Sequence, residues 1–481
     1  MGVLSGLNPA KVFAYFEEIC RIPHGSGNEE AISNYLVDFA KAHNLEHYQD
    51  EAQNVIMIKE ASAGYEDVEP FIIQGHMDMV AVKESDCDID LTKDPLRLRV
   101  DGDVVYAEGT SLGGDDGIAV AYALAILDDD NVAHPRLEVV ITTDEEVGMC
   151  GATAIDLSML KGKRLLNIDS EEEGILTVGC AGGLRAHSVL PVDWIGRKGT
   201  AYEVRLHGLQ GGHSGVEIHK QRGNSNCLMG RLLYGLLDVA DYGIVALDGG
   251  TKDNAIALET VLKIVIDESD EETVLTYIRE FEDTLKKELA KRDPDVTITV
   301  TKENADIYKC LDVLSVRKVA YLLSATPDGV QEMSADIPGL VQTSLNLGIL
   351  RLTEQALELD HSIRSSMASA KQMLKEKVTA VTRLALGRTE YDSDYPAWEY
   401  RPDSPLRDRM VAIYERRYGV KPKVEVIHAG LECGLLSAKI PGLDCVSFGP
   451  DLTDIHTVHE KMHIASVART YEYLLEILAE K

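Results

Sequence analysis

The sequence predicts an α/β fold, with a main domain whose mostly parallel central sheet is flanked by helices, and an inserted α+β domain. Short β-branched apolar runs alternate with helical patterns up to residue 183, and the rhythm changes over 184–396. The remaining segment, 397–481, is too short for another domain of the same kind. We therefore assign 1–183 and 397–481 to the main domain. A length of 481 residues suits two domains, because a single core stops growing at roughly 250–300 residues.

The first part of the main domain contains the elements of a layered α/β structure. Helical periodicity appears at 9–20 and 28–43, and a glycine-rich turn starts an apolar helix at 117–130. Four short apolar runs predict strands, at 54–58, 70–75, 137–143 and 164–168. Runs that are apolar throughout suit a parallel sheet covered by helices on both faces. Such sheets bind ligands at the carboxyl ends of their strands.

The insertion follows a different order of elements. Strands are predicted at 201–207, 261–266, 295–301, 341–350 and 355–364, and helices at 223–240, 271–291, 315–324 and 366–386. The order recurs, which indicates two related α+β halves, although no residue-level repeat accompanies it. The polar, proline-containing stretch 387–405 is typical of a linker. The returning segment contains a helix at 406–418, a strand at 424–428, an apolar run at 443–448 and a helix at 464–479.

Composition argues against several classes of function. Lys and Arg total 48 against 80 Asp and Glu, and the resulting net charge of −32 repels nucleic acid and anionic membranes. The eight cysteines include no C-x-x-C pair, which argues against a zinc ribbon, a redox motif or a disulfide framework. The N-terminus lacks a basic and then apolar leader, and no apolar run reaches about 18 residues. We expect a cytoplasmic protein with no nucleic-acid or membrane partner.

Polar side chains follow four predicted strands at the point where each strand ends. The segments are FIIQGHMDMV, LEVVITTDEEVG, RLLNIDSEE and DCVSFGPDLTDIHTVHEKMHI, and the glycine-rich turn GTSLGGDDGIAVA adds a fifth cluster. Taken singly, acids in such places are typical of a solvated loop or a helix cap. In one parallel sheet, however, these ends can meet. His76 and Asp78, two positions apart, then project to the same side of an extended segment.

This combination of side chains suits metal binding. Carboxylate oxygen and imidazole nitrogen are ligands of first-row metals, with zinc favoured and manganese or cobalt as alternatives. Two divalent ions carry four positive charges, which three carboxylates and a bridging hydroxide would neutralise. A site of three acids and two histidines around two ions could therefore be buried at tolerable cost.

Six motifs, in order and spacing, resemble the aminoacylase and carboxypeptidase clan of co-catalytic metallopeptidases. They are GHMDMV, LGGDDGIA, TTDEEVG, NIDSEE, GGHSGVEIHKQRGNSN and IHTVHEK. Within the clan they are most similar to the aminoacyl-histidine dipeptidases, or Xaa-His dipeptidases, of the bacterial cytoplasm, and the resemblance covers essentially the whole chain. It implies a catalytic main domain, an inserted lid domain, and metal-dependent hydrolysis of unblocked dipeptides, notably Xaa-His.

The resemblance also implies a set of ligands for two divalent ions, most simply Zn²⁺. The set is His76, Asp115, Glu146, Asp169 and His456. Asp115 would bridge the two ions. His76 and Asp169 would complete one site, and Glu146 and His456 the other.

Two further acids of these motifs have roles in the resembling family. Asp78 would orient His76 and raise its basicity. Glu145 would be the general base that activates a metal-bridging water and passes its proton to the leaving amine.

Two alternatives stay open within these motifs. His456 is preferred to His459 because of its place before HEK, although His459 stands where the family usually has an acid. Asp115 is preferred to Asp116 on motif alignment alone. In the family, the peptide bond after the bridging aspartate is often cis.

The remaining candidates concern the substrate. By resemblance, His213 would donate to the oxyanion, with His219 as a weaker second contact, and Arg364 would bind the free carboxylate of a peptide. Glu432, in a glycine-containing loop, would face the substrate amine. Without the resemblance, His213 is more typical of a tight turn and Arg364 of a solvated strand, and Glu432 fits a helix N-terminus equally well.

Two other functions remain as alternatives. One is an amidohydrolase of the same clan that acts on N-acyl amino acids or short peptides. The other is an inert scaffold that keeps the fold, which would be expected to lose the ligands or Glu145. The sequence also leaves open whether the insertion closes its own site or forms a homodimer through an exposed strand edge.

Overall fold

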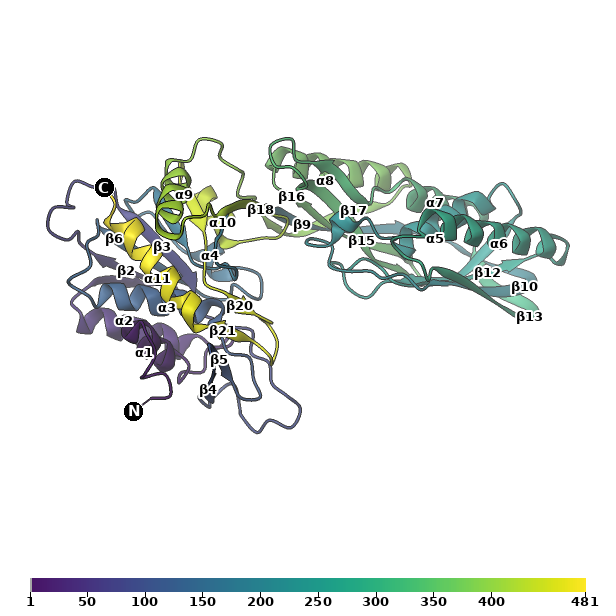
Figure 1. Ribbon diagram of the computed structural model, residues 1–481. Helices are drawn as coiled ribbons and strands as arrows, with labels where there is room; N and C mark the ends of the chain where they lie inside the picture. The colour runs from purple at the N-terminus through teal and green to yellow at the C-terminus, as the bar shows by residue number, and fades with distance from the viewer. Residues whose placement is uncertain (1) are drawn as a thin grey trace. The chain divides into compact units, whose positions relative to one another are not determined.

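The computed structural model describes residues 2–481, which form two compact units (Figure 1). The first unit contains the chain through Cys180, Tyr400–Val426 and Leu431–Lys481. The second contains Ala181–Glu399 and Ile427–Gly430. The first unit therefore ends at Cys180 rather than 183 and resumes at Tyr400 rather than 397. The short segment 427–430, assigned from sequence to the main domain, belongs to the second unit.

The first unit is built on an eight-stranded sheet. In spatial order its strands are β1 (Glu46–Gln49), β2 (Val55–Lys59), β6 (Leu137–Thr142), β3 (Phe71–His76), β7 (Arg164–Asn167), β19 (Asp444–Ser447), β8 (Ile175–Cys180) and β18 (Lys423–Ile427). β6, β3, β7 and β19 pair in parallel. β1, β2 and β8 pair antiparallel with their neighbours. The parallel centre aligns the carboxyl ends of β3, β6 and β7 at one edge.

Helices surround this sheet. They are α1 (Ala10–Ile19), α2 (Glu30–Ala42), α3 (Gly114–Leu127), α4 (Cys150–Ala154), α9 (Pro405–Tyr418), α10 (Glu432–Lys439) and α11 (Ile464–Ala479). Every residue of α3 is buried, because α3 lies between β3 and α1. Its sequence, GDDGIAVAYALAIL, is apolar all round after the first turn, as such a position requires.

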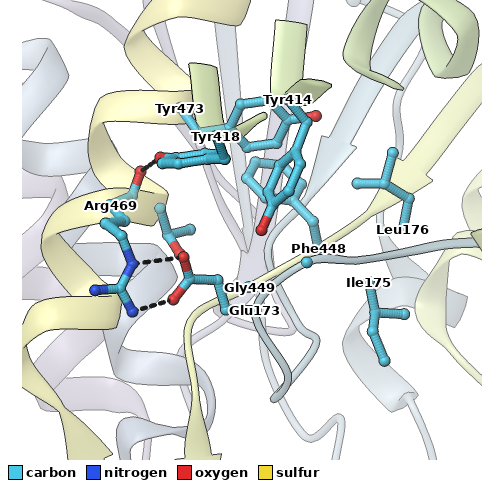
Figure 2. Close-up of a pocket in the computed structure, with 11 residues that line it drawn as sticks. Glu173, Ile175, Leu176, Tyr414, Tyr418, Phe448, Gly449, Arg469 and Tyr473 are labelled. Carbon is cyan, nitrogen blue, oxygen red and sulfur yellow. Dashed lines mark hydrogen bonds and ion pairs between the residues drawn. The ribbon is translucent and has the colours of Figure 1, made fainter. Parts of the chain in front are cut away.

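Aromatic side chains join α9 and α11 (Figure 2). Tyr414 packs against Tyr418 and edge-on against Tyr473, which in turn meets Phe448. They line a cavity of about 10 Å³, room for roughly one water molecule. This cavity is therefore too small for a peptide.

A small four-stranded sheet connects distant segments of the first unit. It comprises β20 (Leu452–Thr453), β21 (Lys461–His463), β5 (Val104–Ala107) and β4 (Leu98–Asp101). β21 pairs antiparallel with β5. The loop between β20 and β21 carries His456, and the chain after β5 leads into α3, so this sheet ties two site-bearing segments together.

The second unit is built on a nine-stranded sheet, whose neighbouring strands pair antiparallel among the described residues. The order is β13 (Thr297–Leu311), β10 (Trp194–His207), β12 (Thr260–Ile266), β11 (Tyr242–Gly249), β15 (Val341–Leu352), β16 (Ala356–Ser365), β9 (Gly182–Pro191) and β17 (Arg388–Tyr395), and β14 (Gly329–Met333) also pairs with β15. Apolar residues of α5 (Ser225–Leu236), α6 (Glu271–Glu288), α7 (Val313–Ala325) and α8 (Ala368–Leu384) pack against one face.

One prediction about the second unit was wrong. The stretch 387–405, expected to be a linker, begins with β17, which pairs with β9 at the edge of the sheet. An edge strand has one side in solvent, so its sequence, RTEYDSDY, is polar and mostly exposed. Because the segment is polar, its sequence did not indicate a strand.

Among the residues that the structure describes, no helix combines the length and the apolar character needed to cross a membrane.

A buried histidine in the second unit makes stability depend on pH. His361, on the core face of β16, is 1% exposed, and its Nε2 lies 3.1 Å from Thr326 Oγ1. Burial lowers the pKa of His361 to about 4. In the unfolded chain a histidine titrates near pH 6.5, so between these values the unfolded state binds more protons than the folded state.

We therefore expect the free energy of unfolding to fall as the pH drops below 6.5, by about 2 kcal/mol from His361 at pH 5. Replacing it (His361→Gln) should remove that part of the pH dependence in urea unfolding at pH 7 and pH 5. Gln at the exposed residue His219 is the control. Equal pH dependence in the wild type and both variants would contradict the neutral state of His361.

Candidate metal centre

The five proposed ligands come from one strand end, one helix start and three loops of the first unit. His76 is the last residue of β3, Asp115 lies in the first turn of α3, and Asp169 follows β7. Glu146 follows β6, and His456 lies between β20 and β21. Because β3, β6 and β7 are parallel neighbours, three ligands leave the same edge of the sheet.

The side chains of these residues converge in two groups that share Asp115. Asp115 Oδ1 lies 3.2 Å from His76 Nε2, and Asp115 Oδ2 lies 3.1 Å from His456 Nε2. Asp169 Oδ1 is 3.5 Å from His76 Nε2. Glu146 Oε1 is 2.8 Å from His456 Nε2. One carboxylate thus faces two histidines, each of which has a second acid beside it.

The charges of this cluster fit cations. Side chains of His76, Asp115, Glu146 and Asp169 are between 1% and 9% exposed, and His456 is 46% exposed. Burial opposes a charge on His76, but its contacts with Asp115 and Asp169 outweigh this and raise its pKa. Hydrogen bonds to Asp115 and Glu146 raise the pKa of His456 to about 10. The three acids outnumber the two histidines, so the cluster favours cations, and its oxygen and nitrogen donors fit two divalent ions.

Asp116 and His459, the two alternatives, have different surroundings. The Asp116 carboxylate is 1% exposed and accepts a hydrogen bond of 3.1 Å from the His76 backbone N–H. It still lies close enough to His76 and Asp169 to share a cation. His459 belongs to none of the candidate ligand groups among the described residues, and its backbone N–H donates to Thr457 Oγ1. The peptide bond between Asp115 and Asp116 is cis.

Asp78 supports the site in a way that the sequence did not indicate. His76 Nδ1 lies 3.0 Å from the backbone oxygen of Asp78 and 3.4 Å from its carboxylate, so the carbonyl is the better acceptor. This bond leaves His76 Nε2 to face the acids. The Asp78 carboxylate, fully buried, instead accepts from the backbone N–H groups of Glu145 and Glu146, at 3.0 and 3.3 Å.

Glu145 has the environment of a proton acceptor. Burial raises the pKa of Glu145 well above its usual value, and the neighbouring charges of Asp169, Glu432 and Glu146 add to the effect. Its carboxylate lies close enough to His76 and Glu146 to share a cation with them. A carboxylate whose pKa is raised accepts a proton more readily than an ordinary one, as a general base requires.

Glu460 is a residue beside the candidate site that sequence reasoning missed. Its carboxylate, 3% exposed, accepts from the backbone N–H groups of Leu112 at 2.7 Å, Gly113 at 3.1 Å and Gly114 at 2.8 Å. These bonds fix the turn that presents Asp115. The sequence did contain one indication of this residue. The backbone N–H groups of a glycine-rich turn at a helix start need a hydrogen-bond acceptor, which has to come from elsewhere in the chain.

The candidates in the second unit also have defined contacts. His213 Nδ1 accepts from the backbone N–H groups of Gly215 and Val216, both at 3.2 Å, so the neutral ring carries its proton on Nε2. Burial and the charge of Arg364 lower the pKa of His213. A Cβ placed on Gly215 would lie 3.0 Å from His213 Cε1 and 3.2 Å from Arg364 Nε, so both side chains border this glycine. His219 is exposed, on the short 3₁₀ helix Ile218–Lys220.

Glu432 lies in the interior of the first unit. It begins α10, is fully buried, and its Oε2 accepts from Gln74 Nε2 at 2.5 Å and Thr142 Oγ1 at 2.6 Å. Burial raises the pKa of Glu432 to about 7. The structure thus brings Glu432 beneath the ends of β3 and β6.

Comparisons with known proteins show which proteins the chain resembles. Residues 72–480 match the profile of Peptidase family M20/M25/M40. The cytosol non-specific dipeptidase of Escherichia coli (strain K12) is 37% identical over 482 residues, covering 100% of this chain and 99% of that protein. The crystal structure of aminoacylhistidine dipeptidase from Vibrio alginolyticus superimposes with a TM-score of 0.94 at 36% identity, covering 100% and 99% of the two chains. Aminopeptidase PepT from Bacillus cereus shares the fold, with a TM-score of 0.56 at 14% identity over 98% of each chain.

We expect the substitution Glu460→Gln to weaken metal binding by about 10- to 100-fold, the range found when groups that support metal ligands are changed. A glutamine offers one acceptor oxygen, and its NH₂ group would oppose a backbone N–H of the 112–114 turn. Affinity is measured by competition with a chromogenic chelator. Glu472→Gln, a surface change on α11, is the control, and unchanged affinity in Glu460→Gln would show that the turn holds Asp115 without it.

Proposed function

Because the chain belongs to peptidase family M20/M25/M40, we propose that it is a cytosolic, metal-dependent dipeptidase that hydrolyses unblocked dipeptides, including those that end in histidine. The observation that carries the proposal is the shared position of Asp115 between His76 and His456, with Glu145 close by. The full-length similarity to a cytosol dipeptidase supports the substrate class.

The proposal assigns five side chains to two divalent ions, with zinc favoured. Asp115 would be shared, His76 and Asp169 would hold one ion, and Glu146 and His456 would hold the other. When bound, the ions supply Lewis-acid stabilisation of the charge that develops on the scissile carbonyl. Asp78 keeps His76 in the tautomer whose Nε2 is available, and it anchors the loop of Glu145 and Glu146.

Glu145 is the proposed general base. It takes a proton from the attacking water and gives it to the amine of the leaving residue, so that the proton lost in attack completes the second product. The raised pKa of Glu145 suits both transfers.

The second unit contributes two proposed contacts with substrate. His213, with its proton on Nε2, donates to the carbonyl oxygen as negative charge builds there. Arg364 binds the C-terminal carboxylate, because a guanidinium can hold both oxygens at once. We do not extend the proposal to Glu432, which is fully buried and bonded to Gln74 and Thr142. His219 likewise receives no role, because its side chain is exposed on the short 3₁₀ helix Ile218–Lys220.

The proposal is tested by release of free histidine from Ala-His, with protein loaded with zinc and protein stripped by a chelator. Release that requires zinc is the expected result. Manganese and cobalt are tested in parallel, because the same ligands accept them. If Ala-His is stable while N-acetylated amino acids are cleaved, the protein is an amidohydrolase; if metal binds and neither substrate is cleaved, it is an inert scaffold.

We expect Glu145→Gln to bind metal as the wild type does and to lose about 10²–10⁴-fold in kcat, because Gln cannot accept the proton. Metal content is measured by atomic absorption and turnover by histidine release. Glu172→Gln, an exposed change in the loop after β7, should keep full activity. Full turnover in Glu145→Gln would assign proton transfer to another group.

A further inference from the structure

Four residues form a row across the sheet of the second unit, on the face opposite its helices. Ser344 of β15 pairs with Arg364 of β16, Arg364 pairs with Gly183 of β9, and Gly183 pairs with Tyr395 of β17. Cross-strand partners project their side chains to the same face. Tyr395 lies two strands away from Arg364, yet its hydroxyl is 3.1 Å from Arg364 Nη1.

Glycine at position 183 makes this contact across two strands feasible. A Cβ on Gly183 would overlap the ring of Tyr395. On another side of the ring, a Cβ on Gly430 would lie 2.8 Å from Tyr395 Cε2, again too close for a side chain. The ring of Tyr395 therefore occupies space that two glycines leave open.

A bulge in β17 selects the residue that faces Arg364. Asp392 pairs with Arg185 and Tyr395 pairs with Gly183, so β17 has one residue more than β9 in this interval. Ser393, inside the bulge, has a φ of 52°. With a regular register Asp394 would stand opposite Gly183, and its carboxylate would compete for the guanidinium. Bulges commonly re-aim side chains in this way.

The backbone around the bulge is anchored from the helical side. Lys371 of α8 donates to the backbone oxygen of Tyr395 at 2.5 Å and to that of Gly183 at 3.3 Å. It also donates to the carboxylate of Asp394 at 2.6 Å. Asp394 is therefore held away from Arg364, and Tyr395 is held beside it.

These contacts leave one side of Arg364 available. Tyr395 occupies Nη1, and Nε is buried without a hydrogen-bond partner among the described residues. Ser344, the neighbour in the row, already interacts with His428 Nε2 at 2.7 Å. The Nε and Nη2 groups of a guanidinium point in the same direction and together match the two oxygens of a carboxylate. A buried donor without a partner is costly, so this side is built to receive an acceptor.

We propose that Tyr395 is a positioning residue that fixes Arg364 for the free C-terminal carboxylate of the substrate. This inference rests on the proposed function of Arg364. The hydroxyl of Tyr395 holds Nη1, so the guanidinium cannot turn about its long side chain, and the Nε–Nη2 side meets the carboxylate. Tyr395 touches no substrate and acts through Arg364 alone.

The test is a double-mutant cycle on the metal-loaded enzyme with Ala-His. The variants are Tyr395→Phe, Arg364→Met and the double variant. Phe keeps the ring between Gly183 and Gly430 and removes only the hydroxyl. The control is Tyr391→Phe on the same strand, whose hydroxyl bonds to Lys375 and Thr379 at the helical side.

We expect Tyr395→Phe to raise KM about tenfold with kcat within about twofold of wild type, because a contact with a non-reacting carboxylate contributes to substrate and transition state alike. In the Arg364→Met background, Tyr395→Phe should leave kcat/KM unchanged, since the residue it positions is gone. Tyr391→Phe should keep the wild-type KM.

Each other result has a separate meaning. If Arg364→Met itself leaves KM unchanged, the carboxylate-binding role within the proposed function fails. If Arg364→Met raises KM and Tyr395→Phe does not, the positioning role fails and the proposed function stands. If Tyr395→Phe lowers kcat/KM equally in both backgrounds, Tyr395 acts independently of Arg364, and the inference is overturned.

Discussion

The first unit depends on one electrostatic constraint, which is that buried carboxylates need positive charge beside them. Asp115, Glu146 and Asp169 are all nearly buried at one edge of the sheet. Burial raises the pKa of Asp169 to about 6, even with His76 in contact. An acid in such a place is either neutral or paired, because an isolated charge in the interior is costly. The loops after the strands, the start of α3 and the hydrogen bond that orients His76 together place cationic partners beside these acids.

The same constraint explains which parts of the site were predictable. His76 and the acids after β6 and β7 are recognisable because each stands where an apolar strand ends, and polar groups at such buried points are unusual unless they are bonded. His456 could not be located by periodicity, since it lies in a loop among other histidines, and only the order of motifs singled it out. Glu460 and Tyr395 escaped notice for a different reason. Their roles arise from contacts with segments far away in sequence, at Leu112–Gly114 and Arg364.

In the fold, too, features set by the local sequence were predictable, and features set by contacts with distant segments were not. The buried strands β3, β6 and β7 were predicted at nearly their observed positions, because strands covered on both faces are apolar throughout. The antiparallel pairing of β1 and β2 at the sheet edge produces no comparable apolar pattern in the sequence. β17 was mistaken for a linker because its exposed side favours polar residues, and the assignment of 427–430 to the second unit depends on contacts rather than on pattern.

The loop between β20 and β21 gives the order of synthesis a functional meaning. His456 and Glu460 both lie near the end of the chain, whereas the turn and the ligand that they complete lie at Leu112–Asp115. While the chain is being made, the early ligands His76 and Asp115 exist for a long time without their late partners. A nascent chain, or a fragment cut before this loop, therefore lacks His456 and Glu460, and with them part of the proposed two-ion centre. On the proposed function, hydrolysis would therefore have to wait until the chain through Glu460 has been made and folded.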